Sequence, residues 1–220
     1  MTKLIGQTPL PTDFGGWTYM VFDEAKTNKK HTLMVYKTPG DIKRHPRDVL
    51  VRVHSSCATS ELFHANNCEC REELEEAMKR IRKEGRGVIV YLDQEGAGNG
   101  ISAKIKVYAK SFTWSSGKVV PVLDPKTGEH ISLYSVYKKL GYLPEARSFG
   151  AAADMLKSIG VKSVRLLTNN PKKAEGLSAC GISAKLASLH IKPKNKIVAE
   201  HLKAKARELG HKISARHYRV

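Results

Sequence analysis

Segments that predict strands and segments that predict helices alternate along most of this 220-residue chain, and that alternation restricts its fold more than any other feature. Residues 31–37 and 48–56 are rich in apolar and β-branched side chains, as strands are. Residues 70–85 carry apolar side chains at helical spacing and end on a glycine, and the apolar run at 87–94 follows at once. Elements that follow one another in this way favour a mixed α/β fold.

The second half of the chain continues the same pattern. We expect helices at 103–112, 132–141 and 151–160, a strand at 161–170 that leads into a helix beginning at Pro171, and closing elements at 182–189 and 199–210. No linker rich in proline or serine and no internal repeat interrupts the pattern. We therefore predict one domain over residues 1–220, of class α/β (mixed α+β), with a mixed sheet and flanking helices.

Two segments differ from this pattern, and the chain as a whole is strongly basic. Residues 113–131 are polar and contain the turn sequence DPKTG, which predicts a surface insertion or a lid. Residues 212–220 form a predicted basic tail. The formal net charge of +17 favours partners that carry phosphates. Because the lysines are scattered and no nucleic-acid-binding motif accompanies them, we do not expect nucleic acid to be the main partner.

The location of the protein is predicted from its apolar runs and its cysteines. No apolar run approaches the 18 residues or so that would cross a membrane, and the N-terminus lacks the apolar stretch of a secretory signal. Four cysteines, three of them clustered, make a poor disulfide framework for a chain of this length. We expect a reducing, cytoplasmic compartment, in which Cys180 serves packing.

Cys57, Cys68 and Cys70 lie within fourteen residues of one another. Thiolate sulfur suits zinc, and a catalytic zinc site has three protein ligands and one open position. The spacing is not that of a zinc finger, so a three-ligand site is favoured. Two alternatives remain open. His54 or His64 could add a fourth ligand and close the site, or the cysteines could be buried packing residues.

Three segments resemble the GTP cyclohydrolase II family of zinc enzymes: VRVHSSCATSELFHANNCEC, EGRGVIVYLDQEGAGNG and VRLLTNNPKK. The resemblance extends from about residue 10 to His211. It implies the mixed α/β fold of the family, a homodimer, one zinc ion per chain, and magnesium bound with the triphosphate. It also implies a role in riboflavin biosynthesis. In the implied reaction, zinc-bound hydroxide attacks C8 of GTP, the imidazole ring opens, and formate and pyrophosphate leave.

The resemblance also implies roles for individual residues. Glu145 matches the general base, Arg147 the arginine that attacks or positions the α-phosphorus, and Tyr108 a tyrosine near the reacting ring. The implied nucleotide-binding residues are Arg52, Val53, His54, Ser55, Ser56, Glu73, Glu95, Gly96, Ala97, Thr168 and Lys173. Taken singly these residues have plainer explanations, with Arg52 and Lys173 as surface charges and Tyr108 as half-buried core.

The chain departs from the family pattern where the substrate is expected. The differing positions are Ser56 for glutamate, Glu73 for glutamine, Ala97 for arginine, Leu133 for threonine and Glu145 for aspartate. Losing the arginine removes a charge-assisted contact to phosphate, and changing an amide to a carboxylate removes hydrogen-bond donors. The leading hypothesis is a ring-opening hydrolase acting on GTP, and a different purine or related nucleotide is the alternative.

Two hypotheses from other classes remain. The first is a zinc-stabilised protein that binds nucleic acid, which the positive charge suggests. The second is a non-catalytic scaffold. An abandoned active site need not keep its functional residues, whereas this chain retains the three cysteines, Arg147, Thr168 and Lys173.

Overall fold

The computed structural model describes residues 1–218, which divide into two compact units. The sheet unit comprises residues 1–56, 72–93 and 148–190. The cysteine unit comprises residues 57–71 and 94–147 and the chain from Ile191 onward. Both units are assembled from separate stretches of sequence. The prediction of one domain over the whole chain stays a prediction.

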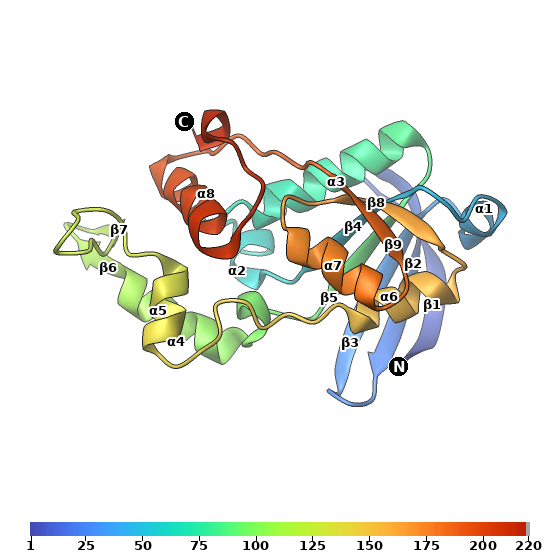
Figure 1. Ribbon diagram of the computed structural model, residues 1–220, viewed down its shortest axis with the longest axis horizontal. Coiled ribbons are helices and arrows are strands. Elements are labelled where there is room, and N and C mark those ends of the chain that lie inside the picture. The colour runs from blue at the N-terminus through green and yellow to red at the C-terminus, as the bar shows by residue number, and fades with distance from the viewer. Residues whose placement is uncertain (219–220) are drawn as a thin grey trace. The chain divides into compact units, whose positions relative to one another are not determined.

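In the described part of the chain, seven strands form one mixed sheet in the sheet unit, in the order β1-β2-β3-β5-β4-β8-β9 (Figure 1). The strands are β1 (Thr2–Thr12), β2 (Gly15–Glu24), β3 (Lys29–Tyr36), β4 (Val49–Ser55), β5 (Val88–Leu92), β8 (Ser163–Leu167) and β9 (Ser183–Ala187). The pairs from β1 to β3, and β3 with β5, are antiparallel, whereas β5, β4, β8 and β9 are parallel. The predicted α/β class is confirmed. The sequence analysis did not identify β1 and β2.

Helices cover both faces of this sheet: α1 (Pro39–Arg44), α3 (Cys70–Glu84), α6 (Gly150–Ser158) and α7 (Pro171–Ala179). Alternate residues of a strand point to opposite faces. Val51 and Val53 of β4 therefore belong to the core shared with α6 and α7, whereas Leu50 belongs to the core shared with α3. Parallel strands with helices on both faces have their carboxyl ends at one edge, which is where ligands bind in such folds.

The cysteine unit is mainly helical. Its elements are α2 (Ala58–Glu61), the short 3₁₀ helix η1 (Gly96–Gly98), α4 (Ile101–Ser111), β6 (Phe112–Ser115), β7 (Lys118–Pro121), α5 (Leu133–Lys139), α8 (Lys196–Leu209) and η2 (Ala215–Tyr218). Helices α4 and α5 pack through a small apolar cluster that includes Val107 and Tyr137. The predicted basic tail contains η2, and its last two residues lie outside the described range.

The predicted insertion at residues 113–131 contains two consecutive hairpins. The first is the β6–β7 pair, and the second is closed by a bridge between Leu123 and His130. The DPKTG sequence forms the tip of the second hairpin, where the Gly128 N–H donates to the Asp124 carbonyl at 2.8 Å. The end of the first hairpin is tied to α4, because the Val122 N–H donates to the Ser111 carbonyl. No helix in residues 1–218 is long and apolar enough to cross a membrane.

Candidate metal and nucleotide sites

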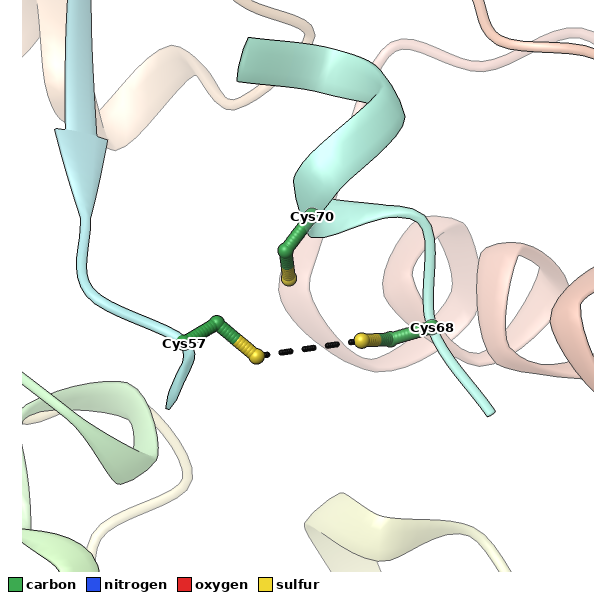
Figure 2. A group of neighbouring side chains, drawn as sticks. All are labelled: Cys57, Cys68 and Cys70. Carbon is green, nitrogen blue, oxygen red and sulfur yellow. Dashed lines mark hydrogen bonds between the residues drawn. The ribbon is translucent and has the colours of Figure 1, made fainter. Parts of the chain in front are cut away.

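The thiols of Cys57, Cys68 and Cys70 converge in the cysteine unit (Figure 2). Their sulfur atoms all lie within 4.8 Å of one another, and those of Cys57 and Cys68 are 3.8 Å apart. Zinc–sulfur bonds of about 2.3 Å in tetrahedral geometry separate two sulfurs by roughly 3.8 Å. The cluster therefore fits zinc. Among the described residues it is the one group of this kind, and it includes no histidine.

The thiols of this cysteine cluster also influence one another electrostatically. Hydrogen bonds from Cys68 and Cys70 lower the pKa of Cys57, and the charge of Lys104 lowers it further. The hydrogen bond to Cys57 raises the pKa of Cys68 to about 12, and contacts with the other two thiols raise that of Cys70. Holding all three sulfurs as thiolates at neutral pH would therefore require a compensating cation, which a divalent metal would supply.

The chain around the cysteine cluster is held by backbone and side-chain hydrogen bonds. Cys57 is the N-cap residue of α2, and its N–H donates to Glu61 Oε1 at 3.0 Å. Cys70 is the first residue of α3. Glu69 between the other two cysteines is buried and forms an ion pair with Lys205 of α8. The segment before α8 adds a hydrogen bond from Asn195 to the carbonyl of Asn66.

Lys104 of α4 lies beside the cysteine cluster, although the sequence analysis did not single it out. Its Nζ lies 3.2 Å from Cys57 Sγ and 2.8 Å from Glu95 Oε1, and the residue is only 4% exposed. Burial lowers the pKa of Lys104, but Tyr108, Cys57 and Glu95 raise it above its ordinary value overall. In sequence Lys104 belongs to a lysine-rich helix, so only its burial distinguishes it.

Tyr108 lies one turn further along α4, and the Lys104 Nζ is 5.4 Å from its ring centroid. Burial raises the pKa of Tyr108, so the phenol stays protonated. The ring also packs edge-on against Phe112 and against the small apolar cluster between α4 and α5. This environment agrees with the plainer role in packing, and the predicted position near the reacting ring stays a prediction.

The predicted catalytic pair, Glu145 and Arg147, forms a bidentate ion pair. Arg147 Nε donates to Glu145 Oε1 at 2.6 Å, and Nη2 donates to Oε2. Burial alone would lower the pKa of Arg147, but the hydrogen bonds and charge of Glu145 raise it. Arg147 therefore carries a fixed positive charge, and Glu145 orients it.

The loop at residues 96–100 holds this pair in place. The Ala146 N–H donates to the Ala97 carbonyl at 2.9 Å. Gly98 has φ +90°, and a Cβ there would lie 2.6 Å from the Ala146 carbonyl carbon, so the two backbones touch. Asn99 Nδ2 donates to the Leu143 carbonyl at 2.8 Å. Ala97 adopts left-handed backbone geometry at φ 55°.

Arg52 is the central charged residue of the sheet unit and is 3% exposed. From β4 its Nη1 donates to the Leu167 carbonyl at the end of β8, at 3.0 Å. Its Nη2 donates to Glu73 Oε2 of α3 and lies 3.4 Å from His54 Nδ1. The predicted residues Arg52, Glu73 and His54 are thus brought together, and Arg52 is not the surface charge of the plainer explanation.

Thr168 and Lys173 lie where β8 leads into α7. Lys173 is 4% exposed, and its Nζ donates to the Val53 carbonyl at 2.8 Å. Thr168 Oγ1 accepts from the N–H of Asn170, whose own side chain caps α7 by accepting from the Lys172 N–H. The amide of Asn169 makes hydrogen bonds with Leu189 in both directions. The two asparagines of TNNPKK therefore shape the turn, a role that the sequence analysis did not assign.

Three buried polar atoms on and just after β4 have no hydrogen-bond partner among the described residues: Arg52 Nε, Ser55 Oγ and Ser56 Oγ. Buried polar groups are nearly always paired with protein, water or ligand. Ser55 and Ser56 lie at and just after the carboxyl end of a parallel strand, which supports a ligand at this edge of the sheet. Ser56 offers a hydroxyl there.

Comparison with known proteins gives a consistent result. The family model described as GTP cyclohydrolase II matches residues 2–186. "GTP cyclohydrolase-2" of Buchnera aphidicola subsp. Acyrthosiphon pisum is 37% identical over 212 residues, which cover 96% of this chain and 99% of that protein. "GTP cyclohydrolase-2" of Haemophilus influenzae is 34% identical over 212 residues, which cover 96% of this chain and 89% of that protein.

Longer proteins also match. "Riboflavin biosynthesis protein RibBA" of Endomicrobium trichonymphae is 35% identical over 205 residues, which cover 93% of this chain and 46% of that protein. A solved structure of RibBX, titled a two-domain 3,4-dihydroxy-2-butanone 4-phosphate synthase from A. baumannii, has a TM-score of 0.39 at 14% identity. It covers 84% of this chain and 40% of its own chain, and this low similarity carries no argument.

Proposed function

Because the chain belongs to the GTP cyclohydrolase II family, we propose that it opens the imidazole ring of GTP at C8 and releases formate and pyrophosphate. The cysteine cluster carries this proposal, since its sulfur spacing fits a tetrahedral zinc ion. The three thiols hold the metal and leave a fourth position open. When bound, zinc supplies Lewis-acid activation of water near neutral pH.

The residues of the sheet unit contribute nucleotide binding in this proposal. Guanine presents an N1–H and an exocyclic amine along one edge, and a carboxylate accepts from such donors. Glu73 offers that carboxylate, and Arg52 neutralises its charge, so that its burial beside the base costs less. Thr168 precedes α7 and Lys173 lies in its first turn, where charge and backbone orientation favour phosphate oxygens.

Arg147 positions the phosphates rather than attacking them in this proposal. An attacking arginine would have to lose its proton, whereas the bidentate contact with Glu145 favours the charged form. Water is then the nucleophile that attacks the α-phosphorus as pyrophosphate leaves, and the guanidinium stabilises the negative charge on the α-phosphate oxygens. Glu145 holds the guanidinium in orientation, and the magnesium that accompanies the triphosphate adds further positive charge.

The assembly and location implied by the family are part of the proposal. We propose a homodimer in the cytoplasm that acts in riboflavin biosynthesis. Sedimentation of the purified protein over a range of concentrations tests the dimer directly. A monomer at all concentrations would refute that part and leave the chemistry untouched.

One observation favours a second candidate function. By the resemblance, Ala97 stands where the family pattern has an arginine, in the loop whose Ala97 carbonyl accepts from the Ala146 N–H, so this chain would lack one charge-assisted contact to phosphate. A ring-opening hydrolase with this change could prefer a purine nucleotide with fewer phosphates, or a different purine.

The decisive experiment is a time course of the zinc-loaded protein with GTP and magnesium, followed by mass spectrometry. We expect ring-opened product, formate and pyrophosphate in equal amounts. Cys68→Ser should abolish the reaction, whereas Cys180→Ser, at the end of α7 in the sheet unit, should not. Full zinc occupancy with GTP left intact would refute GTP as substrate, and a panel of purine nucleotides would then test the second candidate.

A further inference from the structure

Lys104 brings a buried ammonium group against a metal ligand. Its Nζ lies 3.2 Å from Cys57 Sγ, with the side chain 5% exposed. A buried lysine needs a specific reason to stay charged, because burial favours the neutral amine. That reason is Glu95, whose Oε1 lies 2.8 Å from the same Nζ.

Glu95 is itself fixed in position. Its Oε2 accepts from the Ala58 N–H at 2.8 Å, and its Oε1 accepts from the Gly96 N–H at 2.8 Å. Gly96 has φ +61°, and a Cβ there would lie 3.2 Å from Lys104 Cβ, so glycine allows the loop to approach α4 closely. The carboxylate, the ammonium and the thiol therefore form a rigid row within the cysteine unit.

The charge balance of the metal site indicates a function for this row of Glu95, Lys104 and Cys57. Three thiolates around one divalent cation leave one negative charge in excess, and strong sulfur donation weakens the metal as a Lewis acid. A hydrogen bond from a cation to one sulfur draws electron density away from the metal. Such outer contacts tune bound metals, and their loss typically changes affinity or activity by about 10- to 100-fold.

We propose that Lys104 is a positioning residue that orients the Cys57 thiolate and withdraws negative charge from it, so that the three-thiolate site is a stronger Lewis acid. Glu95 keeps the ammonium group in place and aimed at the sulfur. The inference rests on the proposed zinc function and adds a determinant of its strength. The competing explanation is a plain ion pair that attaches α4 to the 96–100 loop.

Cobalt substitution separates the two explanations, because its thiolate-to-metal charge-transfer bands report electron donation by sulfur. The full chain would be loaded with Co²⁺ as wild type, Lys104→Met, Lys104→Gln and Lys104→Arg. Lys110→Met is the matched control, since Lys110 is an exposed lysine in the last turn of the same helix. Circular dichroism would establish that each variant is folded.

We expect the charge-transfer band to move to longer wavelength in Lys104→Met and Lys104→Gln. Lys104→Arg keeps the positive charge and should stay close to wild type, as should Lys110→Met. In the zinc form, kcat for GTP should fall about 10- to 100-fold in the two neutral variants, with KM within about twofold. A structural ion pair alone would not move the band.

Unchanged bands in both neutral variants at full cobalt occupancy would overturn the role of Lys104 while leaving the zinc function intact. A wild-type protein that binds neither Co²⁺ nor Zn²⁺ would overturn the proposed function itself, and Lys104 with it. If neither neutral variant folds, lysine ammonium NMR of the unaltered protein decides. The Lys104 signal must shift when Cd²⁺ is added, and an unshifted signal would refute the contact.

Discussion

In the sheet unit the buried cations of the candidate site are held by backbone carbonyls of strands embedded in a large apolar core, whereas in the cysteine unit they are held by carboxylate side chains. Arg52 and Lys173 both donate to backbone carbonyls of neighbouring strands. In the cysteine unit, Lys104 pairs with Glu95, and Arg147 pairs with Glu145. Its apolar clusters are small. A unit of this kind depends on compensated charge, and a metal held by the cysteine cluster would be part of that compensation.

Metal removal should produce the largest difference between the two units. Cys68→Ser, or chelation of the wild type, should lower turnover more than about 100-fold. Loss of an outer contact to a metal ligand typically costs up to about 100-fold, and loss of a ligand itself should cost more. Hydrogen exchange should rise in residues 57–71 and 94–147 and stay slow in β4, β5 and β8. Equal loss of protection in both units, read by mass spectrometry, would contradict the contrast.

Arg147→Lys should come next in size. Lysine keeps the charge but cannot form the two parallel hydrogen bonds to Glu145. We expect kcat to fall about 100-fold, as when one preorganised donor is removed from an active site. Steady-state kinetics with GTP measure it. A variant with full kcat would show that the fork geometry is unnecessary.

Two glycines of the same loop make a matched pair. Gly98 and Gly100 have φ +90° and +87°, but only at Gly98 would a Cβ meet another backbone, that of Ala146 and Arg147. Both alanine variants carry about 1–2 kcal/mol of left-handed strain. Gly98→Ala should lose about 1–3 kcal/mol more through overlap. Urea unfolding of the two variants measures this difference, and equal losses would refute the close approach.

Glu73→Gln tests the ion pair of the sheet unit and has a smaller expected effect. The amide keeps an acceptor for Arg52 but loses the charge, which should cost about 1–2 kcal/mol of folding free energy. Guanine recognition should weaken too, so the preference for GTP over ITP, which lacks the exocyclic amine, should fall by about tenfold. Competition kinetics between the two nucleotides report it, and an undiminished preference would remove Glu73 from base recognition.

The smallest effect is expected at alkaline pH, in the cysteine unit. Burial raises the pKa of Tyr137 to about 12 from an ordinary 10.0 and also raises that of Tyr134. Between these values the unfolded chain has lost the phenol proton while the folded chain keeps it. The free energy of unfolding should therefore decline as the pH rises from about 10 to 12. Ultraviolet titration of the phenolates against urea stability checks this, and flat stability over that window would contradict it.

Most of the sheet unit could be predicted from the sequence, because its parallel strands are short apolar runs next to periodic helices. Residues 87–94 correspond to β5, and 161–170 contain β8. The sequence analysis did not identify β1 and β2. Strand β1 is largely exposed and lacks the alternation of apolar and polar residues that a buried face imposes. The boundaries of the two units follow contacts between distant stretches, which no local pattern reports.

The candidate site was predictable where it depends on residue type and spacing, and not where it depends on burial. The three cysteines stand out in the sequence, and their convergence agrees with that prediction. Lys104 does not stand out, since Lys106 and Lys110 on the same helix look identical in sequence and only Lys104 is buried. The pairing of Glu73 with Arg52 likewise needs the packing of α3 on the sheet.

The two hairpins between α4 and α5 are a stretch in which the chain can become longer or shorter. Two contacts hold the ends of this stretch together. They are the apolar packing of Val107 with Tyr137 and the hydrogen bond from the Val122 N–H to the Ser111 carbonyl. The contact of Gly98 with Ala146 fixes the segment that contains Glu145 and Arg147 independently of the hairpins. Residues can therefore be gained or lost at the hairpin tips without moving Arg147, so this stretch is where new contacts can be acquired while the chemistry is preserved.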